Sequence, residues 1–182
     1  MTDRIIAIKR SVTFAAALAS TLAVPALADG FILTSPDIAE GQQLSNDSVF
    51  QGFGCEGGNV APALEWSGAP EGTESFAVTV YDPDAPTGSG WWHWFAFNIP
   101  ADVTSLPAGG EVNGVQLTND YGATGFGGAC PPPGEVHRYQ FTVHALGNTL
   151  EIDNSVSNAL AGFMVNANSL ASSTITAVYN RY

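Results

Sequence analysis

The apolar residues of this chain are spaced as they are in β-strands, and this limits the fold more than any other feature. Residues 75–82 and 139–146 alternate between two faces, and residues 92–99 are aromatic on both faces, as in a central strand buried twice. Residues 173–179 are rich in β-branched side chains. Because helical crossovers between strands are missing, we expect a mainly β fold, an antiparallel β-sandwich with a large central sheet.

One helix is predicted in the C-terminal region. Ser155 or Ser157 can cap it, and apolar residues follow at helical spacing. They are Ala159, Leu160, Phe163, Met164, Ala167 and Leu170. Gly162 weakens the intrinsic helix propensity, so we expect the helix to depend on tertiary packing.

Residues 1–28 have the pattern of a secretory signal peptide. A basic stretch precedes the uncharged apolar run 12–24, and residues 26–28 (Ala-Leu-Ala) form a small-x-small cleavage signal. The apolar run is shorter than the roughly 20 residues needed to span a bilayer. We therefore expect an exported bacterial protein, periplasmic or secreted, with no membrane span in its mature form and one domain over residues 29–182.

The expected mature domain is strongly acidic and has no lysine. Arg138 and Arg181 stand against 16 acidic residues, a net charge of −14 over residues 29–182. Two cations cannot form the basic face that nucleic acid or an anionic membrane surface requires, so both are excluded as partners. We expect Arg138 to form a buried structural ion pair with Asp84, and Glu135 or solvent are the competing partners.

Cys55 and Cys130 are the only two cysteines of the chain. In an oxidising compartment such a pair is expected to form a disulfide. It would join two glycine-rich loops, residues 52–58 and 125–134. Two buried or reactive thiols are the alternative.

Three polar clusters lie at the ends of predicted strands. Asp82 opens the rigid turn Asp-Pro-Asp-Ala-Pro, His93 lies among tryptophans, and a Gly-Gly-Ala-Cys-Pro loop leads to His137 and Tyr139. Strand alternation places His137 and Tyr139 on one face, with His144 on the face opposite Tyr139, where we expect it at the surface. Alone, each group is usually structural, as an Asx turn or a hydrogen-bonded core residue. Their co-occurrence indicates a site.

Standard catalytic motifs are missing from the sequence. It contains no nucleophile elbow, zinc-protease helix, phosphate loop or dinucleotide fingerprint. Asp82, His93 and His137 could form a two-histidine, one-carboxylate metal site, although their separations match no helical spacing. We therefore expect no metal and no cofactor, and we rank a hydrolytic or metal-dependent enzyme behind a binding function.

The same residues carry a family resemblance. The chain resembles the phosphatidylethanolamine-binding protein family, in its bacterial Raf-kinase-inhibitor-like branch. The matching segments are residues 54–59, 62–66, 75–86, 90–94, 119–122, 127–132 and 137–139 and the helix with Phe163-Met164. They cover nearly all of residues 29–182, in order. Ala129 stands where the family usually has proline, so this turn is expected to be looser.

The resemblance implies a β-sandwich with Greek-key-like connections and an anion-binding pocket at one end. The expected ligand-binding residues are Asp82, His93, Gly128, Pro131, His137 and Tyr139. Apolar walls are expected from Pro86, Trp91, Trp92, Trp94 and Tyr121. Bacterial members are often dimers, which leaves a homodimer open for this chain.

We accordingly expect a small exported binding module whose ligand carries a phosphate or carboxylate group on an apolar or aromatic body. Binding should tighten below pH ~6.5, when both site histidines tend toward protonation. A protein-interaction module is the alternative, because family relatives inhibit kinases or proteases and the rim of the pocket could contact a partner protein.

Overall fold

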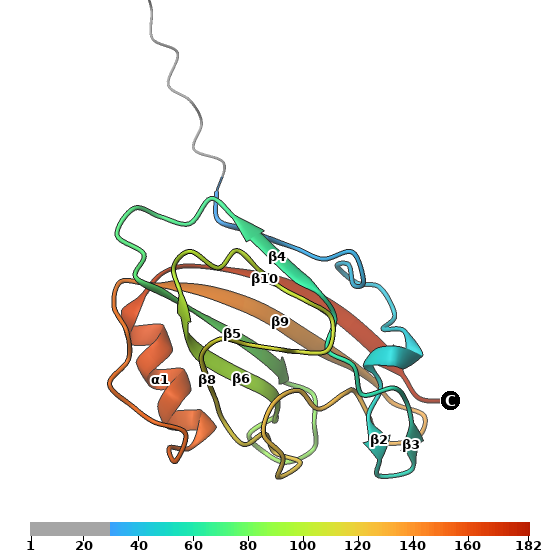
Figure 1. Cartoon of the computed structure of the whole chain (residues 1–182). Coiled ribbons are helices and arrows are strands. Elements are labelled where there is room, and N and C mark those ends of the chain that lie inside the picture. The colour runs from blue at the N-terminus through green and yellow to red at the C-terminus, as the bar shows by residue number, and fades with distance from the viewer. Residues whose placement is uncertain (1–29) are drawn as a thin grey trace, which may run out of the picture.

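The computed structural model describes residues 30–182, so the expected signal peptide lies outside the described residues (Figure 1). The elements, in chain order, are β1 Ile32–Thr34, the 3₁₀ turn η1 Asn46–Ser48, β2 Gln51–Gly52, β3 Cys55–Glu56, β4 Leu64–Ser67, β5 Ser75–Asp82, β6 Trp91–Pro100, β7 Ser105–Leu106, β8 Val115–Gln116, β9 Val136–Leu146, α1 Asn158–Asn168 and β10 Ser169–Asn180. No helix among residues 30–182 has the length and apolar character to cross a membrane.

The strands form a five-stranded sheet, a three-stranded sheet and the small hairpin β2–β3. The strand order is β10-β9-β5-β6-β8 in the large sheet and β1-β4-β7 in the small one, and neighbouring strands run antiparallel. Strand β9 returns to lie beside β5 after β6 and β8 have added to its other side, which is the spatial order of a Greek key. The predicted mainly β, antiparallel fold with one helix is confirmed.

Two apolar clusters hold three layers together. Between the sheets, Leu33 and Trp66 of the small sheet pack with Phe76 and Phe141 of the large one. On the other face of the large sheet, α1 contributes Ala161 and Val165 to a second cluster. Figure 1 shows the same layering, with β4 on one side of the large sheet and α1 on the other. The large sheet is therefore covered on both faces.

The aromatic strand β6 is buried on both sides, as its sequence indicates. Trp94 and Ala96 face the cluster between the sheets, whereas Phe95 and Phe97 face the cluster under α1. All four side chains are fully buried. This position in the centre of the fold fixes the start of β6, where the expected site residue His93 lies.

The helix and the last strand differ from the prediction at their shared boundary. Ser157 is the cap, and its hydroxyl oxygen accepts a hydrogen bond from the backbone N–H of Leu160 (3.2 Å). The helix ends at Asn168 and β10 begins at once, so Leu170 lies in a strand. Pairing with the far end of β9 extends β10 to Ser169, which pairs with Leu146. This tertiary pairing outweighs the local helical spacing.

The expected disulfide between Cys55 and Cys130 is present, with a Cα–Cα distance of 6.0 Å. It ties the β2–β3 hairpin to the loop that precedes β9. These two segments have little regular structure of their own, so the covalent link fixes their relative position.

We expect the double substitution Cys55→Ser, Cys130→Ser to lower the free energy of unfolding by about 2–4 kcal/mol, because a crosslink between residues 75 positions apart restricts the unfolded chain. Urea denaturation of the oxidised protein and the variant measures the difference. A reducing agent should shift the transition of the parent protein but not that of the variant. Coincident transitions of parent and variant would contradict the prediction.

Candidate functional site

A cavity of ≈ 310 Å³ opens at one end of the sandwich. Its lining residues are Phe53, Asp82, Ala85, Pro86, Thr87, Trp91, His93, Tyr121, Cys130, Pro131, Pro132, His137 and Arg181. Three of these, Asp82, His93 and His137, are buried polar residues and form what we call its floor. The exposed Phe53 and the half-buried Arg181 form its rim. The volume suits a small molecule.

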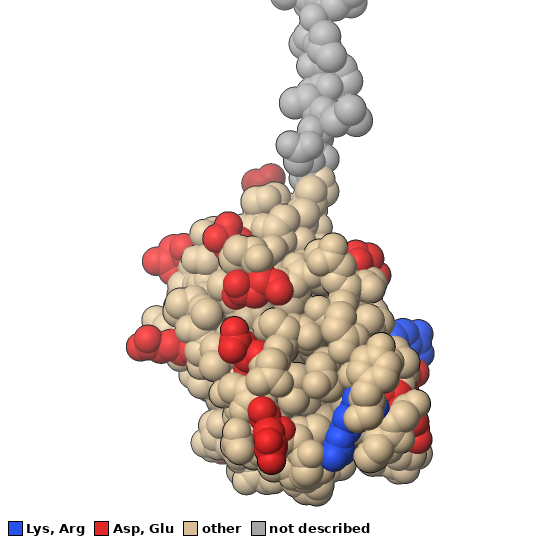
Figure 2. All heavy atoms as spheres, turned by 90° about the vertical axis from the view of Figure 1, so that its right-hand side faces the viewer, with Lys and Arg blue, Asp and Glu red and all other residues tan. Residues whose placement is uncertain are grey.

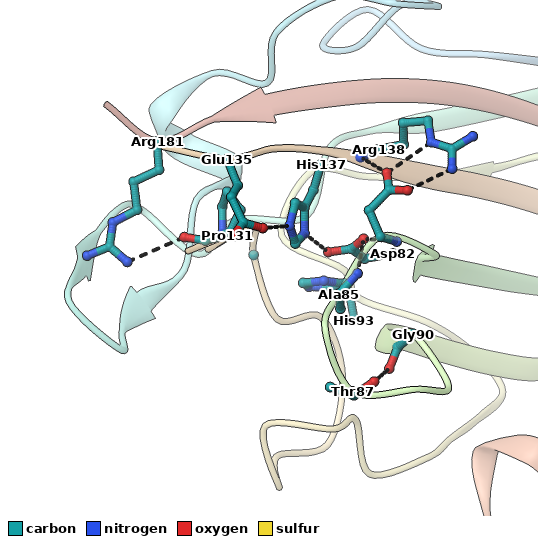
Figure 3. A network of polar contacts seen from close by, with 12 residues as sticks. Asp82, Ala85, Thr87, Gly90, His93, Pro131, Glu135, His137, Arg138 and Arg181 are labelled. Atoms are coloured by element: carbon teal, nitrogen blue, oxygen red, sulfur yellow. Dashed lines mark hydrogen bonds and ion pairs between the residues drawn. The ribbon is translucent and has the colours of Figure 1, made fainter. Parts of the chain in front are cut away.

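The floor is organised by the carboxylate of Asp82. This residue ends β5, and its Oδ1 accepts hydrogen bonds from the backbone N–H groups of Asp84 (2.8 Å) and Ala85 (3.1 Å), as in an Asx turn. Its Oδ2 lies 2.7 Å from Nδ1 of His137, near the start of β9. A single carboxylate thus holds the loop after β5 and orients the imidazole (Figure 3).

His137 lies between two carboxylates. Its Nδ1 contacts Asp82, and its Nε2 lies 3.1 Å from the carboxylate of Glu135, whose side chain is 53% exposed. Burial opposes protonation of this imidazole, but the hydrogen bonds to Asp82 and Glu135 outweigh burial and raise its pKa above 6.5. The protonated ring donates from both nitrogens.

The sequence predicts Glu135 only as an alternative partner for Arg138 and does not predict its contact with His137. The available signal was its position two residues before His137, because residues i and i+2 of an extended segment point to the same side.

His93 reaches the cavity through an irregularity in β6. Val80 pairs with Trp94 and Tyr81 pairs with Trp92, so His93 is an extra residue, a β-bulge, opposite β5. Its Nδ1 lies 2.8 Å from the carbonyl oxygen of Gly127, so Nδ1 carries the proton and Nε2 is the free nitrogen of the neutral ring.

Burial lowers the pKa of His93, more than the backbone hydrogen bond to Gly127 raises it. The expectation that both site histidines become protonated near pH 6.5 is therefore wrong for His93. Of the two imidazoles, His137 is the one whose raised pKa favours the charged form.

Aromatic side chains form one wall of the cavity. Tyr121 stacks on Phe50 with ring centroids 3.8 Å apart and meets Trp91 edge to face at 5.1 Å. The hydroxyl of Tyr121 donates to the carbonyl oxygen of Gly128 (3.1 Å). Phe53 lies 5.5 Å from Tyr121, is 73% exposed, and has a φ of 54°, a backbone conformation that is unfavourable for a side chain. This wall suits an apolar or aromatic ligand body.

Several expected site residues do not line the cavity. The N–H of Gly128 donates to Oδ1 of Asn59 (2.8 Å), so this group is not offered to an anion. Tyr139 follows His137 by two residues on β9 and is buried against His93, with ring centroids 5.1 Å apart. The bulge at His93 turns Trp92 toward the cluster under α1, while Trp94 is buried between the sheets. By contrast, seven expected residues do line it: Asp82, Pro86, Trp91, His93, Tyr121, Pro131 and His137.

Arg138 pairs with Asp84, as expected, but the pair is not buried. The guanidinium binds both carboxylate oxygens, from Nε to Oδ2 (2.9 Å) and from Nη2 to Oδ1 (2.7 Å). The Arg138 side chain is 56% exposed, because it points away from the face that carries His137. The hydrogen bond from the Arg138 side chain lowers the pKa of Asp84 to about 2.

His144 is not a surface residue, contrary to the prediction from strand alternation. The helix α1 covers this face of β9, and His144 is half-buried there beside Thr142 and Val165. Burial lowers its pKa to about 4, so this imidazole is neutral at neutral pH. Its position on the far face of the sheet separates it from the floor.

The described part of the chain, residues 30–182, brings no three histidine, cysteine or acidic side chains together in a way that could hold a metal ion. Both carboxylate oxygens of Asp82 are already engaged, Oδ1 by the backbone N–H groups of Asp84 and Ala85 and Oδ2 by Nδ1 of His137. The two-histidine, one-carboxylate metal site is therefore not formed by these residues.

We expect Asp82→Asn to lower the pKa of His137, because the amide has no negative charge to stabilise the imidazolium. Titration of the imidazole C–H resonances by NMR measures this directly, and Glu151→Gln, at an exposed position, should leave the pKa unchanged. Because the folded-state pKa of His137 is raised, its contribution to stability is complete below pH 6.5 and is lost as the pH rises through that pKa. A His137 that titrates below 6.5 in the parent protein would contradict this geometry.

Known proteins are similar to this chain both in sequence and in fold. The family model described as phosphatidylethanolamine-binding protein matches residues 34–180. The UPF0098 protein YbcL of Escherichia coli (strain K12) is 56% identical over 164 residues, which cover 85% of this chain and 90% of YbcL. The UPF0098 protein YbhB of the same organism is 51% identical over 156 residues, covering 81% of this chain and 99% of YbhB.

A solved structure extends the likeness to three dimensions. The crystal structure of E. coli YbcL, described as a new member of the mammalian PEBP family, has a TM-score of 0.81 to this chain, with 84% of this chain and 99% of that chain covered. The family model covers residues 34–180, and each of these relatives aligns with more than four fifths of the chain. The chain therefore belongs to the phosphatidylethanolamine-binding protein family.

Proposed function

We propose that this protein binds a small ligand through a phosphate or carboxylate group at the floor of the cavity, with the apolar or aromatic body of the ligand against the aromatic wall. The observation that carries this proposal is His137, held by Asp82 in a cavity that His93 and Tyr121 also line. A buried imidazolium is a strong donor to an anionic oxygen. The family name, phosphatidylethanolamine-binding protein, refers to a ligand with the same phosphate chemistry.

The two histidines offer an anionic group different contacts. Nε2 of His137 donates, and its present acceptor, Glu135, would have to be replaced by an oxygen of the ligand. Nε2 of His93 has a lone pair, because Nδ1 carries the proton. It therefore suits a hydroxyl or a protonated phosphate oxygen. Together they fit a group that both accepts and donates.

We propose a binding protein rather than an enzyme. Both nitrogens of His137 face carboxylates, so this imidazole is arranged to hold a charge rather than to take a proton from a nucleophile. We also propose that the protein acts outside the cytoplasm. The disulfide supports this location, since such bonds persist in oxidising compartments.

A protein-interaction function is the second candidate, and one observation favours it. Phe53 projects from the rim with 73% of its surface exposed, held by the unfavourable backbone conformation of the β2–β3 turn. Strained residues at a rim are common at binding sites, and an exposed aromatic side chain is a typical anchor at a protein interface. A protein partner would then cover the same cavity.

We expect phenyl phosphate to bind and His137→Ala to weaken its binding at least tenfold in calorimetric titrations at pH 7. Between pH 7 and 10 phenyl phosphate stays a dianion, so a loss of affinity with rising pH reports the deprotonation of His137, whose pKa is raised. His144→Gln, on the far face of the sheet, is the control and should leave affinity unchanged. Equal affinity for the parent protein and His137→Ala would overturn the proposed function.

Glu135→Gln is expected to raise the affinity for phenyl phosphate about three- to tenfold at pH 6, because the ligand no longer competes with an internal carboxylate for Nε2 of His137. Glu151→Gln is the control, because it removes the same charge from an exposed position away from the cavity. Its neighbour Leu150 is hydrogen-bonded to Asn98, near the end of β6 that is opposite the cavity. If the two variants bind equally, the gain comes from net charge and Glu135 is not a competitor.

A further inference from the structure

Arg181 lies at the rim of the cavity and is held there by the backbone. Its Nη2 donates to the carbonyl oxygen of Gly54 (2.6 Å), and its Nη1 donates to those of Phe53 and Pro131 (3.4 Å each). Figure 3 shows this guanidinium bound to Pro131, and separately the contact between Glu135 and His137. The three carbonyl groups belong to the two segments that the disulfide joins, so the position of the guanidinium is fixed.

The backbone around Arg181 is shaped to receive this side chain. A Cβ atom on Gly54 would lie 2.7 Å from Nη2 of Arg181, so any other residue at position 54 would displace the guanidinium. The N–H of Gly134 donates to the carbonyl oxygen of Arg181 (2.7 Å), which anchors the main chain beside β9. The charge is therefore positioned before any ligand arrives.

The charge of Arg181 is not neutralised by the protein. Within residues 30–182, no carboxylate lies within 4.0 Å of its guanidinium, whereas Arg138 holds Asp84 through two hydrogen bonds. In Figure 2 the blue atoms of these two arginines stand among scattered acidic side chains. An arginine without a carboxylate partner is unexpected in a domain where 16 acidic residues compete for two cations.

We propose that Arg181 is a second anion subsite, so that the preferred ligand carries two anionic groups, one at His137 and one at Arg181. This inference rests on the proposed function, because it assigns the second contact of the same ligand. Nε of Arg181 makes no hydrogen bond to any residue of the described chain, and only one of the two Nη2 hydrogens is used. These donors suit an added carboxylate or phosphate oxygen.

The test compares phenyl phosphate with the three isomers of carboxyphenyl phosphate, which add a carboxylate at different distances on the same ring. We expect at least one isomer to bind the parent protein five or more times as tightly as phenyl phosphate does. Arg181→Gln should reduce this preference to less than twofold. Arg138→Gln removes the same charge from the arginine that does not line the cavity, and should keep the preference.

The outcomes separate the two proposals. If phenyl phosphate binds but no isomer binds more tightly, or if Arg181→Gln keeps the preference, the second subsite is overturned and the proposed function stands. If none of the four compounds binds the parent protein, both are overturned.

Should Arg181→Gln fail to fold, the NMR resonance of the Arg181 Nε–H group in the parent protein decides. Through-bond correlation to the backbone resonances of Arg181 assigns it. A shift with the preferred isomer but not with phenyl phosphate supports the subsite, and equal spectra overturn it.

Discussion

The carboxylate of Asp82 is the interaction on which the site depends. It closes the turn after β5 through two backbone N–H groups and orients His137 across the cavity floor. A buried carboxylate is costly unless each oxygen has a partner, and here both oxygens have one. The arrangement couples the end of one strand to the start of another. The turn after β5 and the orientation of the His137 imidazole therefore depend on the same carboxylate.

Much of this architecture could be predicted from the sequence. Alternation gave the bounds of β5 correctly, and cysteine chemistry gave the disulfide. The positions of Asp82 and His137 beside predicted strands also indicated them as site residues. That they lie together with His93 in one cavity was implied by the family resemblance and not by their spacing in the sequence. What stayed hidden depended on long-range packing. Alternation places His144 on one face but cannot say that a helix covers that face, and the register of β9 with β10 decided where α1 ends.

The partners of the two arginines differ from those that the composition suggests. Excess acid predicts that each cation is paired, and Arg138 is, at the surface, with Asp84. Arg181 is held instead by carbonyl groups at the cavity rim. The exposed carboxylate of Glu135 lies against Nε2 of His137, beside the cavity floor. In such an acidic domain, local geometry rather than net charge determines what the cavity can attract.

The bulge at His93 makes the start of β6 sensitive to residue number as well as to residue type. With one residue fewer there, Val80–Trp94 and Tyr81–Trp92 would pair without a bulge, and Trp91 and Trp92 would keep their faces, because the side chains of a regular strand alternate. The extra position from which His93 reaches the cavity would be lost. Natural variation at this point should therefore proceed by replacement and not by insertion or deletion. The length of this ten-residue strand therefore helps to determine which side chains line the cavity.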